Sequence, residues 1–171
     1  MLEFTVLLTQ AGTRTIIRLP DEISSQFPSR GMNMVSGTVN DAALTLPVEP
    51  DGKGGHWLEI PAEWLKDLEV AAGNPVAVKL AIITEWPEPV LPEDLMLAIA
   101  DGGLDSVWQD LTTRARWEWL RWIRSTKSAA TRARRIEIAL SKLSAGDRRP
   151  CCFNAASCTV PDVAKSGVLI D

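Results

Sequence analysis

The sequence has too little histidine and cysteine for several common kinds of functional site. Its 171 residues include one histidine, His56, and no second histidine or acid at a useful spacing completes a catalytic triad. The three cysteines are odd in number and all lie after residue 150, which does not suit a disulfide framework. We expect reduced thiols and no cofactor. We also expect no metal, because Cys151, Cys152 and Cys158 lack a fourth ligand.

Long apolar runs are also missing. No segment approaches the ~18 consecutive apolar residues that a membrane span requires. The first residues lack the basic region, apolar region and cleavage site of a signal peptide. With 46% hydrophobic and 23% charged residues, the composition is that of a globular protein. We therefore expect a cytoplasmic protein without a membrane span, and its oligomeric state stays open.

Charge is divided unevenly along the chain. Residues 114–149 contain eleven Arg and Lys against three acids, whereas residues 1–113 contain six against seventeen. The overall net charge of −4 hides this division. A chain divided in this way has two parts with different surfaces, and the basic part is the first place to look for a binding site.

Residues 1–85 predict a small β-barrel domain. Short segments with β-branched residues and partial alternation are separated by Gly, Asn and Pro turns. Helical segments near residues 20–28 and 61–68 are expected to cap them. Six short strands with spaced turns are typical of a small barrel. These predicted strands cover residues 2–8, 13–19, 32–39, 42–48, 56–60 and 76–84.

Residues 86–91 are rich in proline and predict an extended linker. The apolar period then changes from two to 3.6, which predicts a bundle of about four short helices over residues 92–149. Residues 150–171 form a cysteine-containing tail with no clear period. The fold class expected for the whole chain is α+β. The helices are expected near residues 92–101, 105–111, 113–126 and 129–144.

The third predicted helix presents a candidate ligand-binding surface. Trp119 and Trp122 share the apolar arc of its helical wheel. Trp117 falls outside that arc, among Arg114 and Arg121. Guanidinium groups at these spacings can stack on an indole ring. Two interpretations stay open: Trp117 packs against another part of the chain, or it is a platform for a base, an aromatic ligand or a peptide.

The fourth predicted helix places Arg132 at the edge of its apolar stripe. A guanidinium that faces inward needs a hydrogen-bond acceptor. We expect Arg132 either to pair with an acid of the helical part, such as Asp105 or Asp110, or to form an anion-binding site. Arg134 and Arg135 point away from the apolar stripe, so we expect them to form a solvated basic face. The candidate ligand-binding residues are Trp117, Arg114, Arg121, Arg132 and Arg135.

Both halves of the chain resemble known families. The helical half resembles the YdeI/OmpD-associated, or bacteriocin-protection, family in residues 91–95, in Trp122-Ile123 with Lys127, and above all in Thr131-Arg132-Ala133-Arg134-Arg135-Ile136. The first half resembles a small barrel domain of unknown function that often precedes that family. The matching residues are 35–40, 55–61 and 73–76.

The resemblance implies a double-split β-barrel, similar in fold to AbrB-like regulators, with a helical appendage. It further implies a bacterial protein linked to envelope stress or protection against antimicrobial peptides, and it supplies no catalytic residues. We expect a non-enzymatic binding module whose partner is an anionic or aromatic small ligand or a protein. One alternative is a nucleic-acid-binding regulator, against which the acidic residues 1–113 argue. Another is a small enzyme that uses His56 or a thiol.

Overall fold

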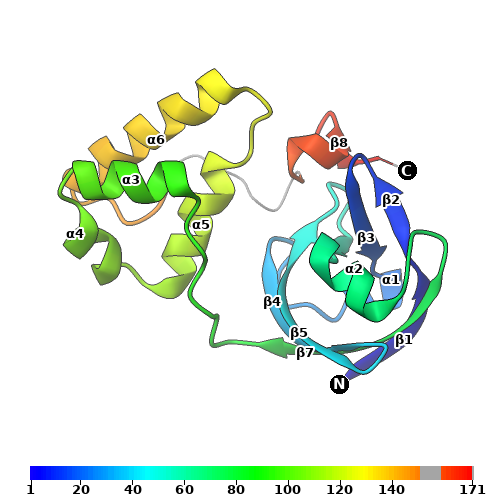
Figure 1. Cartoon of the computed structure of the whole chain (residues 1–171). Coiled ribbons are helices and arrows are strands. Elements are labelled where there is room, and N and C mark those ends of the chain that lie inside the picture. The colour runs from blue at the N-terminus through cyan, green and yellow to red at the C-terminus, as the bar shows by residue number, and fades with distance from the viewer. Residues whose placement is uncertain (151–158, 171) are drawn as a thin grey trace. The chain divides into compact units, whose positions relative to one another are not determined.

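The computed structural model describes residues 1–150 and 159–170, which fall into two compact units. The barrel unit consists of residues 1–84 together with 159–170, and the helical unit consists of residues 85–150 (Figure 1). Strands dominate the first and helices the second, so the predicted α+β class is confirmed. The three cysteines lie outside the described residues, so the expectation that their thiols are reduced also falls outside them.

The barrel unit is built on one curled antiparallel sheet of seven strands. Their order across the sheet is β1-β7-β4-β5-β6-β3-β2; β4 pairs with β5 over seven residues, and β7 pairs with β1 and with β4 over six each. The strands are β1 (Leu2–Leu7), β2 (Thr9–Ala11), β3 (Arg14–Arg18), β4 (Asn33–Val39), β5 (Ala42–Pro50), β6 (His56–Glu59) and β7 (Pro75–Ile83).

All six predicted strands are present, and β2 is an addition. This three-residue strand pairs with β3 across a turn at Gly12, whose φ is +58°. The turn between β4 and β5 has positive φ at both central residues, +46° at Asn40 and +68° at Asp41. This is the backbone geometry of a tight two-residue hairpin, and Asn and Asp tolerate it better than most residues.

The core of the barrel unit lies between the sheet and two short helices, α1 (Asp21–Ser24) and α2 (Ala62–Leu68). Helix α1 contributes the buried Ile23, and α2 packs Trp64 and Leu65 against the same cluster. Each helix follows a proline at its N-cap. Proline suits the start of a helix because the backbone N–H that it lacks would have no acceptor within the helix there. The core therefore combines alternate strand residues with two helical covers.

The C-terminal segment packs on the barrel unit. It forms a short 3₁₀ turn, η1 (Pro161–Val163), and a hairpin of β8 (Ala164–Lys165) and β9 (Val168–Leu169). Its buried Val163 and Leu169 share a cluster with Trp57 of β6. The Trp57 indole N–H donates to Thr159 Oγ1 at 2.8 Å. The part of the tail that is described, for which the sequence showed no pattern, therefore completes a second small core.

The helical unit contains the four predicted helices, α3 (Glu93–Asp101), α4 (Asp105–Asp110), α5 (Thr113–Ile123) and α6 (Ala129–Ser144). Thr112 Oγ1 accepts from the Ala115 N–H at the start of α5, and Ser128 Oγ from the Thr131 N–H at the start of α6. One apolar cluster from all four helices holds the unit together. In the described part of the chain, no helix is both long and apolar enough to cross a membrane.

Candidate functional site

Trp117 lies on α5, where it is half-buried against the proline-rich segment rather than projecting freely. Its indole N–H donates to the backbone oxygen of Pro87 at 2.7 Å. Its ring meets the Trp86 ring edge to face, with centroids 6.4 Å apart and planes at 78°. The residues predicted to be a linker therefore lie against α5 and supply a second indole, which was not expected from the sequence.

Arg114 stacks on a different ring from the one expected. The wheel of α5 suggested Trp117, but the Arg114 guanidinium carbon lies 4.9 Å from the centroid of Trp86. The Arg114 Nε is also 3.9 Å from Glu118 Oε1, one helical turn further on. We call Trp86, Arg114 and Trp117 the aromatic–arginine cluster. Its chemistry is that of a cation–π contact beside a second aromatic face.

Arg132 is paired with an acid of the helical unit, but with neither of the two acids suggested by the sequence. Its Nε and Nη2 donate to the two carboxylate oxygens of Asp94 at 2.8 and 3.0 Å. These bonds lower the pKa of the Asp94 carboxyl and raise that of Arg132. Asp94 lies in the first turn of α3, which contacts α6, and Asp110 instead lies 3.5 Å from Arg148. Two donors of Arg132 are thus already occupied.

Arg121 and Arg135 also differ from their predicted positions. Arg121, four residues after Trp117 on α5, is only 1% exposed and so does not contribute to an open surface. Arg135 was expected to point into solvent, yet its Nη1 donates to the Trp122 carbonyl at 2.7 Å and also to Ser125 Oγ. Its guanidinium lies 5.5 Å from the Trp122 ring centroid. Arg135 therefore fixes the connection between α5 and α6, whereas Arg114 and Trp117 both contact the Trp86 ring.

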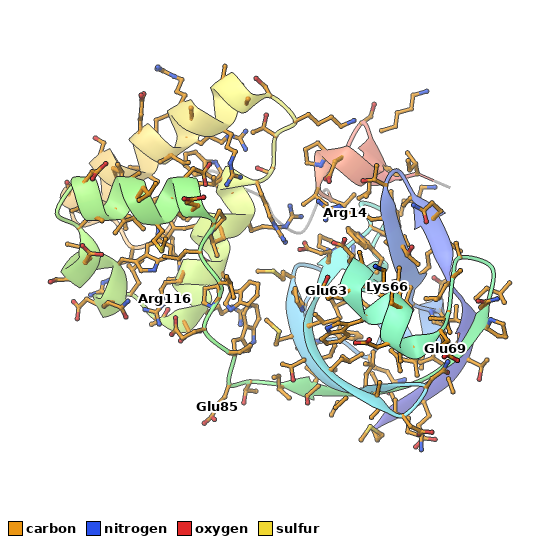
Figure 2. The ribbon with its side chains drawn as sticks, in the orientation of Figure 1. Arg14, Glu63, Lys66, Glu69, Glu85 and Arg116 are labelled. Atoms are coloured by element: carbon orange, nitrogen blue, oxygen red, sulfur yellow. The ribbon has the colours of Figure 1, made fainter. Side chains whose placement is uncertain are left out.

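Arg116 is a buried residue of the same helix that the sequence analysis did not select. It is 5% exposed, and its Nη1 donates to the backbone oxygens of Trp108 and Gln109 at 3.2 Å each, and to that of Leu111. Its Nε donates to Glu88 Oε2 at 3.0 Å, which lowers the pKa of the Glu88 carboxyl. Figure 2 labels Arg116 among the helices of its unit.

A signal for Arg116 was available in the sequence. Residues three and seven positions apart on a helix share a face, so Arg116 lies on the face of Trp119 and Ile123. Those two are core residues, exposed by 0% and 1%. A guanidinium on that face must be given acceptors inside the fold, and the end of α4 provides them. Arg116 holds the linker, α4 and α5 together.

His56, the candidate base of the enzyme alternative, lies inside the barrel unit at 3% exposure. Its Nδ1 is 2.6 Å from Ser24 Oγ, its Nε2 is 3.1 Å from the Ser29 oxygen, and its ring is tilted on Phe27. Because a backbone carbonyl only accepts, Nε2 carries the proton and Nδ1 accepts from the hydroxyl. Burial lowers the pKa of His56, opposed by weaker contributions from the backbone and Asp51. The neutral ring thus acts as a hydrogen-bonded core residue.

Acidification should weaken the barrel unit through this histidine. The pKa of His56 is lower in the folded chain than its ordinary value of 6.5, so the unfolded chain binds the proton first. The free energy of unfolding should be highest above pH 6.5. Between pH 6.5 and the pKa of His56 in the folded chain, the free energy of unfolding should decrease by at most about 1.4 kcal/mol for each pH unit of acidification. Urea unfolding at a series of pH values measures this slope.

The matched variant for this measurement is His56→Gln, which removes the chain's one histidine and keeps an amide that can hydrogen-bond. It should be less stable than the wild type at pH 7.5 and should lose the pH dependence between 6.5 and the folded pKa. An unchanged slope in His56→Gln would assign the effect to other groups.

No group of three or more His, Cys, Asp or Glu side chains is placed to hold a metal ion within residues 1–150 and 159–170. The arginines of the basic segment are largely engaged with acids of their own unit. Among the described residues, at least five of them lie within 4.0 Å of a carboxylate: Arg114, Arg116, Arg132, Arg148 and Arg149. The basic surface expected from the charge division is therefore much reduced.

Two family comparisons agree with the division into units. Residues 88–146 match the family described as "Bacteriocin-protection, YdeI or OmpD-Associated". Residues 4–80 match a domain of unknown function, DUF1905. The first match covers the four helices and the second covers nearly the whole sheet. None of the curated proteins compared with the chain matches it.

Proposed function

We propose that this chain, whose residues 88–146 match the YdeI/OmpD-associated family, is a non-enzymatic binding module in protection against antimicrobial peptides. The observation that carries the proposal is the aromatic–arginine cluster. The Arg114 side chain is 54% exposed, above a Trp86 ring that also borders Trp117. Aromatic and arginine side chains are the residues most often responsible for binding energy at interfaces.

The partner that suits the cluster has an aromatic ring or a carboxylate. Two indoles offer a face and an edge to another ring, and Arg114 offers donors to an acid. Trp117 is prepositioned by its bond to Pro87, so little conformational freedom is lost when a partner binds. This favours a protein or peptide partner, or a small aromatic acid.

The two alternatives receive less support. Binding to nucleic acid depends on cationic groups that are free to contact phosphates. Here five arginines of the basic segment contact carboxylates. An enzyme based on His56 needs an imidazole that substrate can reach, and the ring is 3% exposed.

Protection can be measured directly in bacteria that are sensitive to a cationic bacteriocin. Expression of the wild-type chain should raise the minimal inhibitory concentration above that of cells with an empty vector. Arg114→Glu reverses the charge of an exposed residue, and it should remove the protection without unfolding the chain. Trp117→Ala should also remove it, provided that circular dichroism of the purified variant shows folded helices.

The control is Arg134→Glu, which makes the same charge change on α6 at an exposed arginine outside the cluster. It should protect as well as the wild type. No protection by the wild-type chain would refute the proposed role. Full protection by Arg114→Glu would refute the assignment of that role to the aromatic–arginine cluster.

A further inference from the structure

An open hollow lies within the helical unit, between α4 and the C-terminal end of α6. Its volume is about 470 Å³, which is within the range of sites that hold small ligands. It shares no residue with the aromatic–arginine cluster. Its lining combines an apolar floor with a charged rim.

The floor of the hollow is made by Val107 and Leu111, from α4 and its end, and by Leu143 of α6. Leu111 and Leu143 are 5% and 1% exposed, so their positions are fixed by the core of the unit. Covering such an apolar surface with hydrocarbon lowers the free energy. The same surface makes no hydrogen bond to a hydrated ion.

The rim carries two carboxylates, Asp110 and Asp147, and one guanidinium, Arg148. Arg148 lies 3.5 Å from one Asp110 oxygen and donates to the Asp110 backbone oxygen at 3.2 Å. Within residues 1–150 and 159–170, the Asp147 carboxylate has no hydrogen-bond or ion-pair partner. The charged lining is therefore net negative, with one carboxylate available.

The end of α6 adds to the negative potential. This helix has 16 residues, and Ser144, its last residue, lines the hollow. The last carbonyl groups of a helix carry the negative end of its dipole, which favours cations nearby. The hydroxyls of Ser106 and Ser144 supply further acceptors on the same lining.

We propose that this hollow binds an alkylammonium group. The ammonium hydrogen-bonds the Asp147 carboxylate and lies near Asp110, and the hydrocarbon chain rests on the apolar floor. An anion of the same shape would meet net negative charge and the negative end of α6. The same chemistry is found in free aliphatic amines and in the lysine side chains of peptides. The site goes beyond the proposed function, because it has the opposite charge and lies on other residues.

The test uses n-hexylamine on the purified full chain, followed by two-dimensional ¹H–¹⁵N NMR. Hexylamine should shift the amides of Val107, Leu111 and Gly146 saturably, with a dissociation constant on the order of 1 mM for a ligand of this size. Hexanoate has the same carbon chain and the opposite charge, and it should leave these amides unchanged. Asp147→Asn should weaken hexylamine binding roughly tenfold, because a charge-assisted bond is lost.

The matched control is Glu137→Gln, which removes a charge from an exposed position of α6 outside the hollow. It should bind hexylamine as the wild type does. The proposal is overturned if hexylamine gives no saturable shift at these amides, or if hexanoate shifts them equally. Unchanged affinity in Asp147→Asn would overturn it too. Each of these outcomes is independent of the bacteriocin assay, so failure of one proposal does not decide the other.

A second titration distinguishes the two sources of the group. A short amphipathic peptide with one lysine is compared with the same peptide that carries norleucine there. If only the lysine peptide shifts the amides and competes with hexylamine, the site takes a peptide lysine. If neither peptide shifts them while hexylamine does, it takes a small free amine.

Discussion

Gly37→Ala should destabilise the barrel unit by about 3 kcal/mol or more, although it adds a single methyl group. A Cβ built on Gly37 would lie 1.8 Å from the backbone oxygen of Lys79 and 2.8 Å from its carbonyl carbon. Neither atom belongs to a flexible side chain. The backbone of β7 itself would have to move away from β4, which breaks hydrogen bonds along the strand pair.

Neither strand has room to move. Gly37 pairs with Leu80 of β7 on one side and with Leu44 of β5 on the other. Leu80 is fully buried, and β7 is also paired with β1 along its other edge. A displacement of β7 would therefore disturb both ladders and the core cluster together. The absence of a side chain at position 37 is what allows these strands to approach in the curled sheet.

Urea unfolding, followed by tryptophan fluorescence and far-ultraviolet circular dichroism, measures this effect. The control is Gly102→Ala, a glycine at the end of α3 with an ordinary φ of −80°. There an added Cβ would lie 3.2 Å from the nearest backbone oxygen, so stability should change by no more than about 1 kcal/mol. Equal stability of the two variants would show that β4 and β7 can separate without loss.

Arg116→Met should destabilise the helical unit by roughly 3–5 kcal/mol. Methionine fills much of the same volume but donates no hydrogen bond. The backbone oxygens of Trp108, Gln109 and Leu111 would then each lose a donor; that of Trp108 keeps the Leu111 N–H, and the buried oxygen of Leu111 loses the closest contact. Buried acceptors without a partner cost more than the bond itself contributes, because they are also removed from water.

The comparison with Glu88→Gln separates the buried contacts of Arg116 from its ion pair. The Glu88 side chain is 62% exposed, and glutamine keeps an oxygen that can accept from the guanidinium. The Glu88→Gln variant should lose less than about 1 kcal/mol of stability, as is usual when an exposed ion pair is removed. The ellipticity of the helices during thermal unfolding is the appropriate measurement. Similar losses in both variants would indicate that the carbonyl contacts contribute little.

The regular elements of this fold were predictable because their signals are local. Period-two segments bounded by turns gave the six long strands, and period-3.6 segments with N-caps gave the four helices of the second unit. Strand β2 and the hairpin of β8 and β9 have two or three residues each, too few for a period to be recognised. Strand β2 depends on its pairing with β3, and the hairpin of β8 and β9 is held because Val163 and Leu169 are buried in one cluster with Trp57, about 100 positions away in the sequence.

The candidate site was predictable in its chemistry and less so in its geometry. A helical wheel correctly separated Trp117 from the apolar arc of α5 and placed Arg114 near it. It could not show that an extended segment returns along the same helix, so Trp86, the ring that Arg114 covers, was missed. Arg132 pairs with an acid of the helical unit as expected, but that acid is Asp94 of α3 and neither of the two examples on α4. Sequence periodicity describes one element, and partner choice depends on which elements touch.

The barrel unit is discontinuous in the sequence: residues 1–84 and 159–170 form one body, and the helical unit is an insertion between them. A cut at the proline-rich segment would therefore not release an intact barrel. A fragment of residues 1–84 would lack the strands that cover Trp57 and would leave its indole N–H without Thr159. Dissection of this protein should instead excise the helices and join residue 84 to the C-terminal segment through a linker.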